Sequence, residues 1–189
     1  MTGSPTTGSP APGSRTPESR PRGSLTLVLG GARSGKSRHA EALIAAHPAP
    51  WHYIATAEAL DAEMAARIAE HRDRRDARWI THEAPRDLAG ALTVLPDGVP
   101  VLIDCLTLWL SNLILADADL EVETARIAEV LATPRGAWVV VANEVGLGIV
   151  PDNALARRFR DAAGVLNQRL AAGADRVVLC VAGVPMTVR

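Results

Sequence analysis

The chain has 189 residues, of which 48% are hydrophobic and 22% are charged, as expected for one well-buried globular domain. Its 20 basic and 21 acidic residues give a formal net charge of −1, which excludes a nucleic-acid binder that relies on bulk positive charge. No apolar run approaches the ~20 residues that span a bilayer, so we expect no membrane span. The 2 cysteines are too sparse to staple a fold, and we expect a reducing, cytoplasmic setting.

The first segment, residues 1–23, has five prolines and four glycines and almost nothing apolar. Such a segment cannot bury enough surface to offset its ordering entropy, so we expect a disordered tail. It also lacks the apolar stretch of a secretory signal. We expect the remaining residues, 24–189, to form a single folded domain.

Apolar runs alternate with segments of helical periodicity after this tail. The sequence predicts strands over residues 25–29, 52–55, 79–81, 99–103, 137–142 and 176–181. It predicts helices over residues 36–46, 59–75, 85–95, 106–115 and 120–131, and from a cap at Asp152 to about residue 171. Pro85 is expected in the first turn of the third helix. Continuous β-branched runs separated by helices indicate an α/β domain whose mostly parallel sheet is covered by helices on both faces.

A phosphate-binding motif follows the first predicted strand and opens the first predicted helix. Its eight residues are Gly30, Gly31, Ala32, Arg33, Ser34, Gly35, Lys36 and Ser37, a full match to G-x-x-x-x-G-K-[ST]. Glycines let backbone N–H groups surround phosphate oxygens at the start of a helix. Lys36 is also the only lysine of the chain, which suggests a chemical requirement. The motif predicts a P-loop NTPase-like nucleotide site rather than a plain glycine-rich turn.

A carboxylate is expected to help Ser37 hold Mg²⁺ at such a loop. Asp104 follows an apolar strand directly and is the first candidate, although an ordinary acid at a strand end would look the same. Glu144 follows another strand and is a second candidate, in a loop whose polar residues and glycines also suit a plain turn.

The helix predicted over residues 59–75 carries one histidine among arginines. Arg67, His71, Arg74 and Arg75 fall on one helical face, with Arg72 and Arg78 close in sequence. Several arginines around one imidazole could form an anion site. The alternative is a solvated basic face with an incidental histidine, which is the more frequent outcome for a run of charges.

Several motifs in order resemble the bifunctional adenosylcobinamide kinase/adenosylcobinamide-phosphate guanylyltransferase family. They are GGARSGKSRHAEAL, YIATAEALDAEMAARIAEHRDRR, W-x-T-x-E, DCLTLWLSNL and NEVGLGIVPDNALARRFRDAAGVLNQRLA, and the resemblance runs from about Leu25 to the C-terminus. It implies two reactions in cobalamin biosynthesis. The first phosphorylates adenosylcobinamide with ATP or GTP, and the second transfers GMP from GTP onto adenosylcobinamide phosphate, giving adenosyl-GDP-cobinamide.

The resemblance also implies roles for particular residues. The phosphate loop would bind nucleotide, and His71 would become guanylylated. The loop motif itself predicts that Lys36 is catalytic and that Ser37 and Asp104 hold Mg²⁺. Other residues that match nucleotide contacts of the family are Ala55, Thr56, Ala57, Arg72, Asp73, Arg74, Arg75, Glu83 and Asp104. The family further implies a homotrimer.

Two other functions fit the residues alone. One is a P-loop kinase for another small alcohol, in which His71 only binds phosphate. The other is a nucleotide-dependent switch or corrinoid-binding module without catalysis. The chain has no N-K-x-D guanine motif, and the arginine–histidine helix would have no clear task in a switch.

Overall fold

The computed structural model describes residues 23–59 and 61–189, so the tail predicted over residues 1–23 lies outside the described residues except for Gly23. The strands are β1 (Ser24–Gly30), β2 (Trp51–Ala55), β3 (Trp79–Glu83), β4 (Val101–Asp104), β5 (Ala137–Asn143), β6 (Arg176–Val181) and β7 (Val184–Thr187). The helices are α1 (Lys36–Ala45), α2 (Ala62–Asp73), α3 (Leu88–Thr93), α4 (Leu106–Leu115), α5 (Leu120–Ala132) and α6 (Ala154–Gly173). Among these residues, no helix is both long enough and apolar enough to cross a membrane.

All seven strands form one sheet in the order β3-β2-β4-β5-β1-β6-β7. Every neighbouring pair is parallel except β6 and β7, which are antiparallel. The central strands carry continuous apolar runs because helices cover both of their faces. The predicted α/β fold with a mostly parallel sheet is therefore confirmed.

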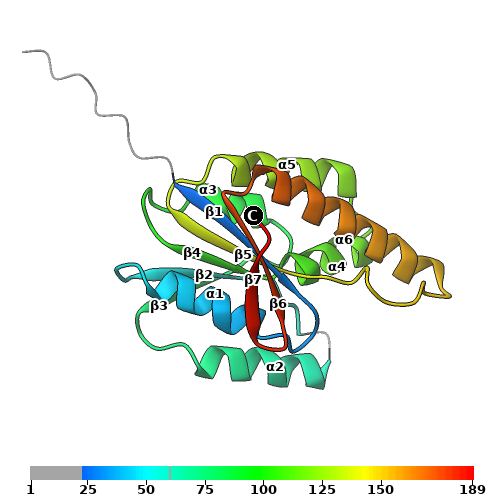
Figure 1. Cartoon of the computed structure of the whole chain (residues 1–189), viewed down its shortest axis with the longest axis horizontal. Coiled ribbons are helices and arrows are strands. Elements are labelled where there is room, and N and C mark those ends of the chain that lie inside the picture. The colour runs from blue at the N-terminus through cyan, green and yellow to red at the C-terminus, as the bar shows by residue number, and fades with distance from the viewer. Residues whose placement is uncertain (1–22, 60) are drawn as a thin grey trace, which may run out of the picture.

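The helices divide between the two faces of the sheet (Figure 1). On one face, Val28, Tyr53 and Leu102 pack with Ala40 and Ile44 of α1. On the other face, the side chains of α3, α4, α5 and α6 form the larger core with the alternate residues of the same strands. Successive residues of a strand point to opposite faces, so each strand contributes to both cores.

Three predicted helix starts are wrong by one to three residues, and each difference has a local cause. The helix predicted from residue 59 begins at Ala62, because the Asp61 side chain caps it by accepting from Met64 N at 2.7 Å. The helix predicted from Pro85 begins at Leu88, and its cap is Asp87. Helix α6 is capped by Asn153, whose Oδ1 accepts from Ala156 N at 2.7 Å, and not by Asp152.

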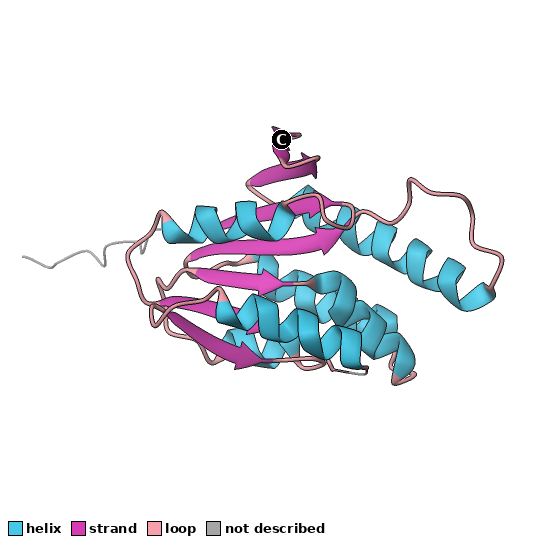
Figure 2. Cartoon of the chain, turned by 90° about the horizontal axis from the view of Figure 1, so that it is seen from below, coloured by secondary structure: helices cyan, strands magenta, loops and turns pink. Residues whose placement is uncertain are grey.

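Strand β7 has no counterpart in the sequence prediction. It pairs with β6 through a two-residue turn, in which Ala182 and Gly183 both have positive φ, 50° and 84°. A turn with two left-handed residues matches the right-handed twist of the strands that it joins. The turn also reaches the phosphate loop, because Gly183 N donates to Ser34 O at 3.0 Å. Figure 2 shows this hairpin at the side of the sheet that β7 closes, next to the C-terminus of the chain.

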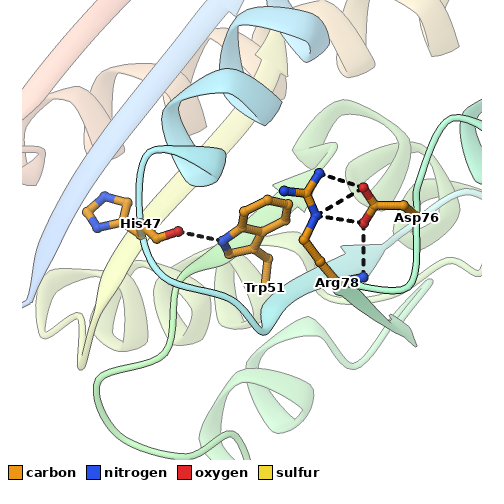
Figure 3. A network of polar contacts seen from close by, with 4 residues as sticks. All are labelled: His47, Trp51, Asp76 and Arg78. Atoms are coloured by element: carbon orange, nitrogen blue, oxygen red, sulfur yellow. Dashed lines mark hydrogen bonds and ion pairs between the residues drawn. The ribbon is translucent and has the colours of Figure 1, made fainter.

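A polar network fixes the amino ends of β2 and β3 (Figure 3). Trp51 Nε1 donates to His47 O at 2.8 Å, which ties the end of α1 to the start of β2. The Arg78 guanidinium lies 4.5 Å from the centre of the Trp51 ring and is paired with Asp76 at 2.6 Å. Arg78 therefore contacts Trp51 and Asp76 at the amino ends of the strands, although it lies close to His71 in the sequence.

Candidate functional site

The phosphate loop joins the end of β1 to the start of α1. Gly35 has a φ of +88°, and a Cβ there would stand 3.1 Å from Gly183 Cα, so glycine suits this position on both counts. No side chain caps the first turn of α1, which leaves its backbone N–H groups available for phosphate oxygens. Lys36 Nζ donates to Gly31 O at 3.1 Å and so lies over the loop. The eight loop residues thus adopt the arrangement that the motif predicts.

The strand register brings further predicted residues to the same edge of the sheet. Gly30 is opposite Asn143, and Ala55 lies between Glu83 and Asp104 on its two neighbouring strands. Ligands of parallel α/β sheets collect at this carboxyl edge. The edge therefore contains the phosphate loop, Ala55, Glu83 and Asp104 together.

Buried oxygen atoms without hydrogen-bond partners mark this edge. They include Asp104 Oδ2, Asn143 Oδ1 and Ser34 Oγ. A buried acceptor that lacks a partner is costly unless a ligand supplies one. Hard oxygen donors of this kind fit Mg²⁺, which takes one or two carboxylates and fills its other positions with water and phosphate oxygens. No group of three or more potential His, Cys, Asp or Glu ligands occurs in the described part of the chain.

The side chain of Thr56 has a structural role in the fold. Its hydroxyl donates to Cys105 O at 2.7 Å and accepts from Cys105 N at 2.8 Å. Asn112 Nδ2 donates to Thr56 O at 2.7 Å. The fully buried threonine thus holds the end of β2 against the junction of β4 and α4, and its hydroxyl proton is committed to Cys105 O.

The C-terminal end of α2 brings His71 and two of its arginines to α1 and β2. His71 Nδ1 lies 2.8 Å from Arg74 Nη2. The guanidinium of Arg75 lies 3.7 Å from the centre of the Tyr53 ring, and its Nε and Nη1 are buried without hydrogen-bond partners. Arg72 and Asp73 are exposed, and the side chain of Arg67 lies outside what the structure describes. The arginine cluster predicted around His71 therefore exists in part, with unsatisfied donors suited to an anion.

Glu41 is the member of this site that sequence reasoning missed. Its Oε1 is buried without a hydrogen-bond partner and lies 4.0 Å from Arg74 Nη2. Burial raises the pKa of this carboxyl, and Asp104 raises it too, while Arg74, His71 and Arg75 act in the other direction. One signal was available, because Glu41 follows Ser37 by four residues and so lies on the same face of α1.

Glu83 and Glu144 occupy different surroundings. Glu83 is exposed and lines an open cavity of about 520 Å³, beside Glu58 and Arg86, which form an ion pair at 3.1 Å. Glu144 Oε1 accepts from Gly146 N at 2.6 Å, so its carboxylate caps its own loop. The structure thus gives Glu144 a local structural contact, whereas Asp104 Oδ2 is buried without a hydrogen-bond partner.

The chain is similar to known proteins along almost its whole described length. Residues 26–188 match the family described as cobinamide kinase / cobinamide phosphate guanyltransferase. The bifunctional adenosylcobalamin biosynthesis protein CobP of Pseudomonas aeruginosa is 49% identical over 166 residues, which cover 86% of this chain and 96% of that protein. The protein named CobU of Salmonella typhimurium is 44% identical over 186 residues, which cover 87% of this chain and 99% of that protein.

Among solved structures, an ATPase from the type III secretion system of pathogenic bacteria has the same fold class, with a TM-score of 0.50 and 10% identity over 88% of this chain and 57% of that one. At such low identity the likeness concerns the P-loop fold alone. The match to the family and to the two relatives is stronger evidence, because it covers the sheet and every element of the site. The chain belongs to the cobinamide kinase / cobinamide phosphate guanyltransferase family.

Proposed function

We propose that this chain phosphorylates adenosylcobinamide with ATP or GTP and then transfers GMP from GTP onto adenosylcobinamide phosphate, through a guanylyl group carried by His71. The product is adenosyl-GDP-cobinamide, with pyrophosphate released. The observation that carries the proposal is the placement of two anion sites near one another. The phosphate loop with Lys36 begins α1, and the His71 end of α2 lies against Glu41 of the same helix.

The kinase step uses the loop and its lysine. Backbone N–H groups at the start of α1 bind the phosphates, and the Lys36 ammonium lies beside the transferring γ-phosphoryl group. Ser37 and Asp104 would hold Mg²⁺, which neutralises charge on the β- and γ-phosphate oxygens when bound. The hydroxyl oxygen of adenosylcobinamide forms a bond to the γ-phosphorus and gives up its proton to solvent. The bond to the bridging oxygen breaks, and the nucleoside diphosphate leaves with that electron pair.

The guanylyl step uses His71. A ring nitrogen forms a bond to the α-phosphorus of GTP, and the bond from that phosphorus to the bridging oxygen breaks, so pyrophosphate leaves. A phosphate oxygen of adenosylcobinamide phosphate then attacks the same phosphorus, which breaks the P–N bond and restores the imidazole. Arg75, with two buried unpartnered nitrogen atoms, and the nearby Arg72 and Arg74 would neutralise the phosphates during both displacements.

Exposed apolar residues and free cysteines support proposals for the assembly and the compartment of the protein. A long loop stands out before α6 (Figure 2), and Leu147 and Ile149 on it are 87% and 97% exposed. Exposed apolar side chains suit an interface between subunits, and the family resemblance implies that the assembly is a homotrimer. Light scattering should then give three times the 19.9 kDa chain mass. Both cysteines are free thiols, which supports a cytoplasmic protein.

The two reactions can be tested with the full chain, Mg²⁺, adenosylcobinamide and nucleotide. ATP alone should give adenosylcobinamide phosphate, and the addition of GTP should give adenosyl-GDP-cobinamide with pyrophosphate release that depends on corrinoid. Chromatography separates the three corrinoids. No corrinoid product with either nucleotide would contradict the proposal, and phosphorylation of an unrelated alcohol in preference to adenosylcobinamide would point to a different kinase.

A further inference from the structure

The hydrogen bond between Arg74 and His71 has a chemical consequence for the proposed nucleophile. A guanidinium is only a donor, so His71 Nδ1 accepts at 2.8 Å with its lone pair. A neutral imidazole that accepts through Nδ1 carries its proton on Nε2. The lone pair of Nδ1 therefore accepts the hydrogen bond from Arg74, and Nε2, which carries the proton, has no free lone pair. In this arrangement His71 cannot attack phosphorus.

The same Arg74 nitrogen has a second acceptor within reach. Nη2 lies 4.0 Å from Glu41 Oε1, which is buried and has no hydrogen-bond partner. A movement of about 1 Å would bring this pair to ordinary hydrogen-bond distance. A guanidinium–carboxylate bond joins two charges, so it is stronger than the bond from the guanidinium to a neutral imidazole.

Glu41 belongs to a helix that packs into the core, whereas Arg74 lies at the end of a more exposed helix. On α1, Glu41 lies between Ala40 and Ile44, both fully buried in the core. The Arg74 side chain is 39% exposed, and it follows a helix with no buried side chain among those that the structure describes on it. The arginine can thus change partners while the carboxylate stays in place.

From this geometry we infer that Glu41 is a positioning residue for guanylyl transfer: its carboxylate draws the Arg74 guanidinium from His71 Nδ1 and so frees the imidazole for attack. The inference rests on the proposed role of His71. Glu41 touches neither reacting atom and acts only through Arg74. The charged groups that face Glu41 are His71, Arg74 and Arg75 from the end of α2 and Asp104 from β4.

The test measures covalent labelling of the full chain by saturating α-labelled GTP in a single turnover. Glu41→Gln should slow labelling by about tenfold or more, the scale of one hydrogen bond to a charged group. Arg74→Gln replaces the charged guanidinium by a shorter, neutral amide, so adding Glu41→Gln to it should change the rate by no more than about twofold. Glu70→Gln, which removes a carboxylate from an exposed position of α2, is the matched control and should label at the wild-type rate.

A second measurement does not depend on how Glu41 variants fold. The wild-type labelling rate should rise with pH as the Glu41 carboxyl ionises, and Arg74→Gln should lack that part of the rise. Wild-type labelling by Glu41→Gln, the same slowing in the Arg74→Gln background, or pH profiles of equal shape in the wild type and Arg74→Gln would each overturn the inference. Labelling that persists in His71→Ala would instead overturn the proposed function, so the two failures are distinguishable.

Discussion

Lys36 supplies the positive side-chain charge on which the proposed kinase step depends. It is the only lysine in the sequence, and its ammonium group lies over the loop through its bond to Gly31 O. Residue type and motif sufficed to predict this position, because the loop is a local structure. Glu41 could not be predicted in the same way, since its importance comes from α2, a separate helix that brings Arg74 to within 4.0 Å.

Replacing Lys36 by alanine should lower the kinase rate by about a hundredfold or more, the scale of an electrostatic contact to a transition state. The measurement is phosphorylation of adenosylcobinamide at saturating ATP. Lys36→Arg is the control: it keeps the charge but not the compact ammonium, so it should recover only part of the rate. Near-normal phosphorylation by Lys36→Ala would overturn the loop's assignment.

The thiol of Cys105 gives a second prediction for a single residue. Burial raises the pKa of Cys105 to about 11, with a further increase from Asp104, and the residue is only 5% exposed. The thiolate is the reactive form, so the native protein should resist iodoacetamide at pH 8 and react after unfolding. Mass spectrometry of the modified peptide reports the outcome, and rapid alkylation in the folded state would contradict this burial.

Helices and strands were predicted best where their signal is local and strong. Helix α4 and strand β6 have the predicted bounds, since each is rich in apolar residues and has clear ends. Helix starts were less accurate, because Asp152 and Asn153 are both good capping residues and sequence alone does not choose between them. Strand β7 was missed since all its residues are exposed, and its four-residue length leaves little pattern.

The cap of α6 can be tested with neighbouring substitutions. Asn153→Ala removes the acceptor for Ala156 N and should cost about 1 kcal/mol of stability, which lowers the melting temperature by roughly 2–4 °C. Asp152→Ala is the matched control and should leave melting nearly unchanged, because this position does not cap the helix. Thermal unfolding followed by circular dichroism distinguishes them, and equal losses from both variants would contradict the assignment of the cap.

At the scale of the whole molecule, the sheet was predictable in kind but its strand order was not. Apolar β-branched runs between helices indicate parallel strands under two helical layers. The order β3-β2-β4-β5-β1-β6-β7 depends on where each crossover returns, which a single sequence does not encode locally. That order places β1 between β5 and β6 and next to the hairpin turn at Gly183, and so it assembles the site from distant segments.

Removing residues 1–22 should leave the melting temperature and both reactions nearly unchanged. This segment has almost no apolar side chains to bury, whereas Gly23, the first residue kept, donates to Pro134 O at 3.1 Å. Parallel melting curves and corrinoid assays of the full and shortened chains provide the comparison. A large fall in melting temperature would show that the tail packs on the domain.

The central claim is that His71 carries the guanylyl group, and covalent labelling tests it most directly. Incubation with α-labelled GTP should leave label on the denatured chain, located on His71 by mass spectrometry, labile to acid and comparatively stable to alkali, as a P–N bond requires. Label from γ-labelled GTP should be absent, and His71→Ala should lose both the α-label and guanylyl transfer. Undiminished α-label in His71→Ala would contradict the account.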